Sequence, residues 1–315
     1  MATTRAFEPV KGSAKTLGKE IFEGLEPGKV AARDAVGREE GYFRTVDGEK
    51  IYWQSWRTKA EEPSGVVLIM HGYGEHSRRY EHVAVALVRA GYEVFALDAR
   101  GHGKSTGPRG FVERFSRYTD DLSELKRRVR DRFPEVPLFV LGHSNGGLIA
   151  LDYALRQPEG VSGFLIVSPY LGLAVEVPLA KEAAGKVMSR VFPQVSLPSG
   201  LSGDMVSHLP TVIENYDSDA LIFDVANSRW FTETTETWGR LFRRAEELVQ
   251  PFFFSVAGAD VVADSREAEK FFHLLGSKDR EMEIHPELFH EVLNESEWTE
   301  IVTRMLIWMD ARQEG

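Results

Sequence analysis

Short runs typical of buried strands alternate with longer stretches of helical period along most of the chain. Such runs, apolar throughout or nearly so, mark strands covered on both faces, as in parallel sheets. They occur at Gly65–Met70, Tyr92–Leu97, Leu138–Leu141, Gly163–Val167 and Phe252–Ala257, and a further strand is expected at Glu281–Ile284. Helices are expected at Arg79–Ala90, Tyr118–Phe133, Asn145–Gln157, Asp264–Leu275 and Glu297–Arg312. Strands that alternate with helices form βαβ units, so the pattern predicts an α/β fold with a mostly parallel central sheet flanked by helices.

The first part of the chain departs from this rhythm. Tyr42–Thr45 and Lys50–Trp53 flank a Val-Asp-Gly turn and predict a β-hairpin. Before it, Leu17, Ile21 and Leu25 have the spacing of a short amphipathic helix. This leader is interpreted either as an arm packed on the core, in part unstructured, or as a helix that touches a membrane.

The rhythm stops after Val167 and resumes at Phe252. The stretch between them contains no convincing strand but has two apolar stripes at helical spacing, which predict a helical insertion. The stripes follow Pro178 at Leu179, Ala183, Val187 and Val191, and recur at Trp238, Leu241, Phe242 and Ala245. The chain is therefore divided into an N-terminal leader or arm (1–39), a first core part (40–171), a helical cap (172–248) and a second core part (249–315).

The length, net charge and cysteine content of the chain exclude some classes of function. A length of 315 residues suits one enzyme-sized domain with an insertion, and the net charge of -10 argues against binding to nucleic acid through a global positive field. Cysteine is absent, which excludes disulfides and thiolate chemistry. The first 30 residues lack a secretory apolar region and no apolar run approaches roughly 18 residues, so a cytoplasmic location is expected.

Ser144 is the candidate nucleophile. Gly142-His143-Ser144-Asn145-Gly146 lies between a predicted strand and a predicted helix, which is the context of a G-x-S-x-G elbow. In such an elbow the serine hydroxyl is exposed on a strained turn, and small neighbours are needed around it. The backbone N–H of Asn145 is a candidate oxyanion donor at the helix N-terminus, so its side chain is expected to be free to vary.

A second glycine-containing loop follows the Gly65–Met70 strand. Its Tyr73 N–H is the candidate for the other oxyanion donor, with His71 and Glu75 bracing the loop. An alternative hypothesis is a metal cluster, because four nearby residues are of types that bind metals: His71, His76, Asp98 and His102. The loop after Leu97 is more simply explained as a buttress, in which Asp98 binds backbone groups or Arg100.

A nucleophilic serine needs a base and a group that orients the base, in the chain order Ser, acid, His. Asp260 directly follows the Phe252–Ala257 strand and is the favoured acid. Asp264 competes, but it stands three residues before Glu267 at a helix start, which is the spacing of a capping box.

His290 is the favoured base because a loop separates it from the preceding strand. His285 directly follows that strand and precedes a proline, which fixes an extended backbone there. His273 falls within a predicted helix among apolar residues and is interpreted as structural.

Taken together, these motifs resemble the monoacylglycerol lipase and lysophospholipase family of α/β-hydrolases over roughly residues 40–312. The resemblance rests on His71–Ser77 with Arg79-Tyr80, Asp98–Ser105, Gly258–Asp260 and Phe289–Glu295. It implies the α/β-hydrolase fold, a cap over an acyl-chain pocket, and Tyr73 and Asn145 as oxyanion donors. Asn145 stands where family members often carry methionine, and the leader before residue 40 has no counterpart.

The predicted function is cleavage of lipid-type carboxylic esters by Ser144, His290 and Asp260, without a metal or organic cofactor. An aminopeptidase of the proline-iminopeptidase kind is an alternative, with Glu214, Asp217, Asp219 and Asp224 as candidate partners of a substrate amine. A catalytically silent ligand-binding protein is another alternative.

The expected partner is a small-molecule ester with an acyl chain. Nucleic acid is not expected, transient contact of the cap with a membrane or micelle is compatible with the sequence, and the oligomeric state is left open.

Overall fold

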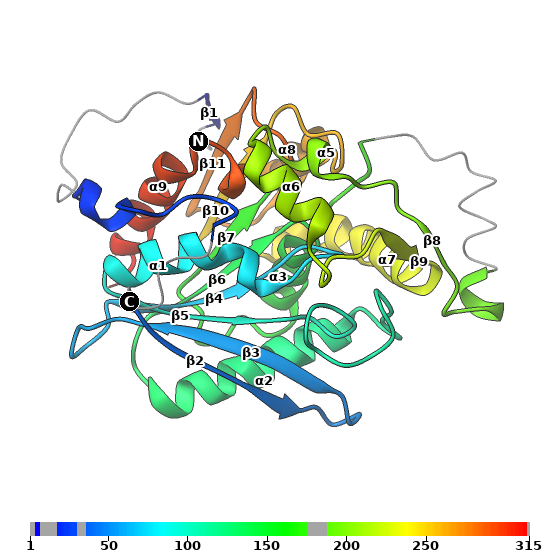
Figure 1. Cartoon of the computed structure of the whole chain (residues 1–315), viewed down its shortest axis with the longest axis horizontal. Helices are drawn as coiled ribbons and strands as arrows, with labels where there is room; N and C mark the ends of the chain where they lie inside the picture. The colour runs from blue at the N-terminus through cyan, green and yellow to red at the C-terminus, as the bar shows by residue number, and fades with distance from the viewer. Residues whose placement is uncertain (1–3, 7–17, 30–35, 175–187, 314–315) are drawn as a thin grey trace.

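A single mixed sheet forms the centre of the protein (Figure 1). The computed structural model describes residues 4–6, 18–29, 36–174 and 188–313. Over these residues the sheet has nine strands in the order β1-β11-β10-β7-β6-β4-β5-β3-β2. Their bounds are β1 (Thr4–Ala6), β2 (Gly37–Arg44), β3 (Lys50–Arg57), β4 (Gly65–Met70), β5 (Tyr92–Leu97), β6 (Leu138–His143), β7 (Gly163–Val167), β10 (Phe252–Ala257) and β11 (Arg280–His285).

The strand pairings confirm the predicted mostly parallel sheet. From β1 across to β5 every neighbouring pair is parallel. The predicted hairpin is β2 and β3, which pair antiparallel and place Tyr42 opposite Tyr52. Because β3 also pairs antiparallel with β5, the hairpin extends one edge of the sheet.

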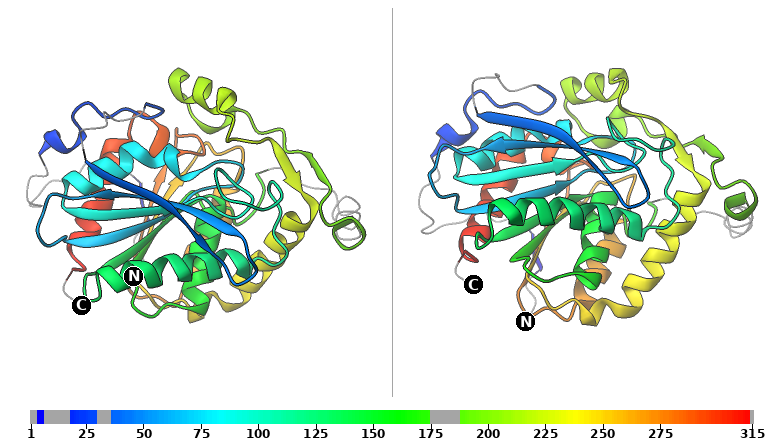
Figure 2. Two further views of the ribbon diagram at one scale, coloured as in Figure 1. Left: turned by 60° about the horizontal axis from the view of Figure 1, so that its bottom comes forward. Right: turned by 90° about the horizontal axis from the view of Figure 1, so that it is seen from below.

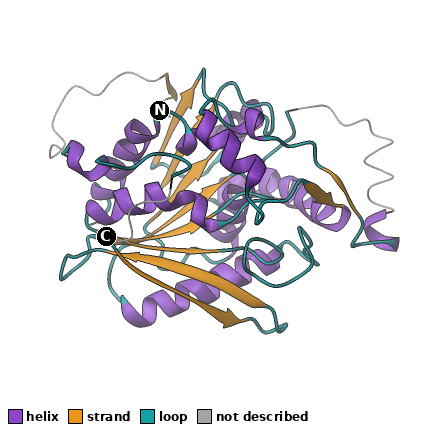
Figure 3. Ribbon diagram, viewed as in Figure 1, coloured by secondary structure: helices purple, strands orange, loops and turns teal. Residues whose placement is uncertain are grey.

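Helices cover both faces of the sheet (Figure 3). The burial of the β4 side chains shows why. Successive strand residues point to opposite faces. Val66 and Leu68 belong to one buried cluster, with residues of α2 (Ser116–Arg132), α3 (Asn145–Arg156) and α8 (Ser265–Leu274). Val67 and Ile69 belong to the other, with residues of α1 (Glu81–Arg89) and α9 (Trp298–Asp310). Burial on both faces explains the continuous apolar runs in the sequence.

The described part of the leader packs on the core. Ile21, in the 3-10 helix η1 (Lys19–Phe22), and Leu25 are buried in the same cluster as α1 and α9. Closer to the N-terminus, β1 runs parallel to β11 at the edge of the sheet. Leu17 of the predicted stripe lies outside the described residues. Ile21 and Leu25 of the leader therefore direct their side chains toward the protein core.

The segment between β7 and β10 runs along one side of the sheet (Figure 2). Its described elements are β8 (Ser196–Pro198), α5 (Gly203–Val206), α6 (Pro210–Ser218), β9 (Val225–Asn227), α7 (Ser228–Arg244) and the 3-10 turn η3 (Ala245–Glu247). The prediction that this segment lacks strands is wrong, since β8 and β9 pair antiparallel. Strands of three residues are too short to produce a readable alternation.

Only one of the two apolar stripes predicted in this segment can be followed. On α7, Leu241 is fully buried and Trp238 and Phe242 pack against the core, as expected. Most of the other stripe, from Pro178 to Val187, lies outside the described residues. Its last member, Val191, is 59% exposed, so this residue does not face the core. The division of the chain at residues 39, 171 and 248 stays a prediction.

No helix in the described ranges is both long enough and apolar enough to cross a bilayer. The cytoplasmic location stays a prediction.

Candidate active site

Ser144 occupies the tight turn between β6 and α3. Its backbone has φ 53° and ψ -118°, a strained conformation for a residue other than glycine. The flanking glycines are required because the chain passes very close to itself. A Cβ atom at Gly142 would lie 2.3 Å from the carbonyl oxygen of Gly146, and one at Gly146 would lie 2.1 Å from that of Met70. The strand-turn-helix context predicted for the elbow is present.

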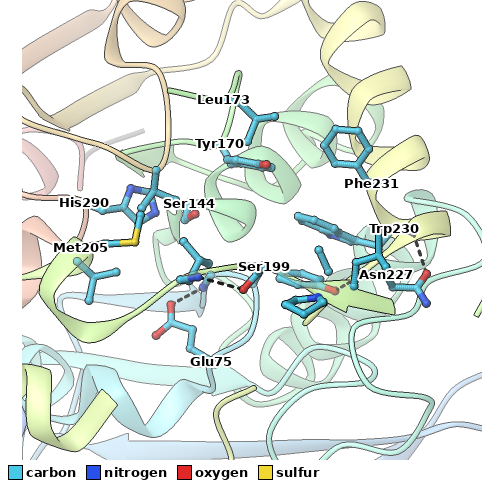
Figure 4. Close-up of a pocket in the computed structure, with 18 of the residues that line it drawn as sticks. Glu75, Ser144, Tyr170, Leu173, Ser199, Met205, Asn227, Trp230, Phe231 and His290 are labelled. Atoms are coloured by element: carbon cyan, nitrogen blue, oxygen red, sulfur yellow. Dashed lines mark hydrogen bonds between the residues drawn. The ribbon is translucent and has the colours of Figure 1, made fainter. Parts of the chain in front are cut away.

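The structure brings Asp260 and His290 together beside the same pocket that Ser144 lines. The Nδ1 atom of His290 lies 2.7 Å from Oδ2 of Asp260. The other carboxylate oxygen accepts the backbone N–H groups of Val262 and Ala263 at 2.8 and 2.9 Å, which holds the acid in place after β10. Figure 4 shows His290 next to Ser144 at one side of the pocket.

The electrostatics of this pair suit a base that takes up a proton. Burial works against a charged imidazole, but the Asp260 carboxylate outweighs it and raises the pKa of His290 above its usual value. Likewise, burial would raise the pKa of Asp260, yet His290 and two backbone N–H groups hold that pKa below its ordinary value. An Nδ1–H that donates to Asp260 leaves Nε2 as the basic nitrogen of His290.

Asp264 and His285 have partners of their own, and none of the three competing residues lines the pocket. Asp264 caps α8 by accepting the Arg266 N–H at 3.0 Å, in keeping with the capping role inferred from the sequence. His285 is the last residue of β11, and its Nε2 lies 2.9 Å from Oγ of Ser255. His273 lies on α8 with its ring against Phe272. Of the two candidate acids, Asp260 is the one bonded to His290.

The two predicted oxyanion donors flank Ser144. Asn145 is the first residue of α3, so its N–H has no partner within the helix. Tyr73 belongs to the loop after β4, and this loop passes close to the nucleophile. A Cβ atom at the neighbouring Gly72 would lie 3.3 Å from Cβ of Ser144. The assignment of these N–H groups to an oxyanion hole stays a proposal.

Bracing of the oxyanion loop by His71 and Glu75 is confirmed. Oε1 of Glu75 accepts the Gly72 N–H at 2.6 Å and the Tyr80 hydroxyl at 2.7 Å. Nε2 of His71 accepts the Ala99 N–H at 2.9 Å. Burial lowers the pKa of His71, which keeps it neutral and able to accept this bond. Both side chains therefore hold the loop through backbone groups.

A buried ion-pair network that sequence reasoning missed links this loop to the histidine loop. Arg79 lies 2.7 Å from both Oε2 of Glu75 and Oε2 of Glu291, the residue after His290. Burial would raise the pKa of Glu75, but Arg79 and His143 hold it well below its usual value. His143 in turn contacts the carbonyl oxygen of His290 through Nε2 at 3.2 Å. Partners 212 residues apart leave no local pattern in the sequence.

The four residues considered as a metal cluster have separate partners. His76 pairs with Asp219 at 2.9 Å, and Nδ1 of His102 contacts the Arg100 carbonyl. Asp98 accepts backbone N–H groups of Ser77 and Lys104. The alternative in which Asp98 binds Arg100 is wrong, because that guanidinium pairs with two other aspartates, Asp47 and Asp121. Among the residues that the structure describes, no group of three or more ligand-type side chains is arranged to hold a metal ion.

Ser144 and His290 open onto a pocket of about 760 Å³ with a largely apolar wall. Most of this wall comes from the segment between β7 and β10. Its apolar and aromatic members there are Tyr170, Leu173, Met188, Val195, Leu197, Pro198, Leu201, Met205, Val206, Tyr216, Ala226, Trp230 and Phe231. Trp230 and Phe231 lie at the side of the pocket away from His290 (Figure 4). The volume is within the range of ligand sites that bury an organic molecule.

Comparison with known proteins agrees with this geometry. A family described as serine aminopeptidase, S33, matches residues 61–297. A monoacylglycerol lipase of Mycolicibacterium smegmatis is 30% identical over 273 residues, covering 86% of this chain and 97% of that protein. The human monoglyceride lipase is 31% identical over 247 residues, covering 78% and 81%.

A phospholipase of Bacillus subtilis, YtpA, is 31% identical over 244 residues, covering 77% of this chain and 93% of that protein. Among solved structures, the monoacylglycerol lipase of Paleococcus ferrophilus superposes with a TM-score of 0.74 at 28% identity, covering 83% and 99%. The resemblance seen in the sequence motifs is thus confirmed. The chain belongs to the monoacylglycerol lipase and lysophospholipase family of α/β-hydrolase-fold enzymes, a family of carboxylic ester hydrolases.

Proposed function

We propose that the protein hydrolyses lipid-type carboxylic esters, monoacylglycerol or lysophospholipid, through an acyl-enzyme on Ser144. The observation that carries this proposal is the position of Ser144. It lies on a strained elbow beside the His290–Asp260 pair and at the wall of an apolar pocket of about 760 Å³. The curated relatives include enzymes named monoacylglycerol lipase and phospholipase, which supports the same substrate class.

The reaction has two acyl-transfer steps. Oγ of Ser144 attacks the ester carbonyl while Nε2 of His290 takes up its proton, and Asp260 stabilises the imidazolium that forms. The N–H groups of Tyr73 and Asn145 bind the oxygen that becomes negatively charged. His290 then protonates the departing alcohol, and a water molecule activated by the same histidine releases the fatty acid. Each step uses side chains and backbone groups of this chain.

The pocket wall supports an aliphatic substrate tail. Burial of an acyl chain against apolar side chains contributes about 0.8 kcal/mol per methylene group. The apolar members of the wall outnumber the polar ones, and the two carboxylates in it, Glu75 and Glu291, are both paired with Arg79. Binding energy therefore comes mainly from the tail, and the reacting ester lies at the polar end beside Ser144.

The aminopeptidase alternative is not favoured by the positions of its candidate carboxylates. A substrate amine would need a carboxylate free to face the pocket. Asp219 pairs with His76, and Asp217 accepts the Gly203 N–H. Within the described residues, neither these two nor Glu214 and Asp224 line the pocket. An ester with an aliphatic acyl chain fits this wall better than a peptide with a free amino group.

An exposed apolar patch supports contact with lipid aggregates. We define the cap patch as Met188, Val191, Phe192, Val195 and Leu197, whose exposed fractions range from 37 to 65%. Three of its members, Met188, Val195 and Leu197, also line the pocket. Contiguous exposed apolar residues mark interaction surfaces. A patch that continues into the pocket suits transfer of a lipid from a membrane or micelle to Ser144.

Parallel assays with three substrates test the proposal. Long-chain monoacylglycerol and lysophosphatidylcholine should be hydrolysed. Prolyl-naphthylamide should be turned over at least about a hundredfold more slowly, because no carboxylate among the described lining residues is free to bind its amine. Preferred cleavage of the amide substrate would support the aminopeptidase alternative. Binding of lipid without turnover of any ester would support the silent ligand-binding alternative.

A further inference from the structure

Trp230, near the start of α7, contacts both residues of the proposed oxyanion hole. Its indole ring stacks on the ring of Tyr73 with centroids 3.6 Å apart and planes at 24°. Its Nε1–H donates to Oδ1 of Asn145 at 3.3 Å. Trp230 and Asn145 are 4% and 1% exposed, so water does not readily replace this bond. The Asn145 side chain thus has a specific partner that the sequence analysis did not foresee.

The indole of Trp230 also lies beside the ring of Tyr170. These two rings are nearly parallel, at 10°, with centroids 5.8 Å apart. The backbone N–H of Tyr170 donates to the carbonyl oxygen of Ser144 at 3.0 Å. Two aromatic neighbours, Tyr73 and Tyr170, restrict the tilt of the indole, which keeps its N–H directed at Asn145.

The first turn of α7 also holds the far end of the Tyr73 side chain. Asn227 caps the helix, with Oδ1 accepting the N–H groups of Arg229 and Trp230 at 2.9 and 3.3 Å. The backbone N–H of Asn227 donates to the Tyr73 hydroxyl at 3.1 Å. That hydroxyl donates to the Gly110 carbonyl, also at 3.1 Å. The ring of Tyr73 is thus fixed on its face by Trp230 and at its hydroxyl by the helix cap.

We infer that Trp230 is a positioning residue that sets the placement of the two oxyanion donors, the N–H groups of Tyr73 and Asn145. This inference rests on the proposed function, since the oxyanion hole is part of it. Donors must lie about 2.7–3.1 Å from the developing oxyanion. A misplacement of about 1 Å can cost about a hundredfold in rate. The resulting loss falls on the transition state, so it lowers kcat and leaves KM nearly unchanged.

Two conservative substitutions isolate the Trp230–Asn145 bond. Trp230→Phe keeps an aromatic ring between Tyr73 and Tyr170 but removes the donor, and Asn145→Leu removes the acceptor while keeping the backbone N–H. Each should lower kcat, and the rate of Ser144 phosphonylation by a fluorophosphonate, about tenfold, with KM within about twofold of wild type. The double variant should be no slower than either single variant, because both remove the same bond.

Phe242→Leu is the matched control. Phe242 also lies on α7, twelve residues after Trp230, and its ring packs against Phe271 of α8 and does not line the pocket. Loss of this ring should lower the melting temperature without lowering the phosphonylation rate. Melting temperatures of all variants separate effects on folding from effects on the reaction. If Trp230→Phe does not fold, Asn145→Leu alone decides, by a tenfold fall in kcat at constant KM.

The possible failures can be told apart. Independent, multiplicative effects of the two substitutions, or an increase in KM without a change in kcat, would overturn the role of Trp230 while the proposed function stands. Failure of the wild-type protein to react at Ser144, or full turnover by Ser144→Ala, would instead overturn the proposed function.

Discussion

The core of the protein and the segment between β7 and β10, which we call the cap segment, contribute to the site in different ways. In the core, the ends of β6, β10 and β11 deliver Ser144, Asp260 and His290 from three distant parts of the chain. The cap segment supplies most of the pocket wall, including Leu197 of β8, Ala226 of β9 and Phe231 of α7. Loops at the carboxyl ends of parallel strands meet at one edge, which makes the reacting groups a consequence of the sheet. The range of substrates depends on a wall that the sheet does not determine.

The largest effect is expected from the nucleophile in the core. Ser144→Ala should lower kcat by roughly 10⁶, because a triad that acts as a unit loses nearly all of its advantage with any central member. Steady-state hydrolysis of a p-nitrophenyl ester measures it, with the melting temperature as a check on folding. Turnover within tenfold of wild type would show that another residue is the nucleophile.

The next largest effect distinguishes two neighbouring acids in the core. Asp260→Asn should lower kcat by about 10⁴, since the amide no longer stabilises the imidazolium or the required tautomer of His290. Asp264→Asn is the matched control, because that side chain caps α8 and should affect stability more than rate. A larger loss of kcat in Asp264→Asn than in Asp260→Asn would reverse the assignment.

Substitution in the cap segment should change substrate range without removing the chemistry. Ala226→Phe places a ring in the pocket wall and blocks about three methylene positions, worth about 2.4 kcal/mol or roughly fiftyfold in kcat/KM for long acyl chains. Short esters should be hydrolysed nearly as well as by wild type. Ala220→Phe makes the same change at an exposed cap position outside the pocket. An equal loss for short and long esters would place the acyl chain elsewhere.

The pH dependence of kcat/KM reports on the His290–Asp260 pair in the core. The pKa of His290 is raised, chiefly by Asp260 acting against burial, so the neutral base is lost as the pH falls through that raised value. The acid limb of kcat/KM should therefore lie above the ordinary imidazole value of about 6.5 and fall about tenfold per pH unit. In Asp260→Asn the limb should move to lower pH. A limb that stays in place would mean that another group titrates.

The smallest effect is expected at the outer surface of the cap segment. Replacing Val191 and Phe192 by serine removes apolar area from the cap patch and should lower binding to phospholipid vesicles about fivefold. Turnover of a soluble short-chain ester should be unchanged, because neither residue lines the pocket. Val46→Ser, at an exposed valine of the β2–β3 turn, is the control. Equal vesicle binding by all three proteins would separate the patch from lipid contact.

The difference between the core and the cap segment also explains which site residues could be predicted from the sequence. Ser144 and Asp260 follow the fully buried strands β6 and β10, whose apolar runs are recognisable without any tertiary information. His290 follows the partly buried strand β11 and is identified by its place after the acid in the chain. The strain at Ser144 requires glycine at 142 and 146, which leaves a mark in the sequence. The core positions could therefore be predicted from local pattern and chain order.

Contacts between residues far apart in the chain leave no recognisable pattern in the sequence. Trp230 bonds to Asn145 over a separation of 85 residues, and Arg79 pairs with Glu291 over 212. The β8–β9 pair is too short for its alternation to be read. These features depend on how the cap segment and the loops pack, which a single sequence does not reveal through periodicity.

Peptide mapping after reaction with a fluorophosphonate tests the central claim most directly. The reagent should add one phosphonyl group per chain, on the peptide that contains Ser144, and the labelled protein should lose its ester hydrolysis in proportion. Modification of a different residue, or full hydrolysis by a protein labelled at Ser144, would contradict the account.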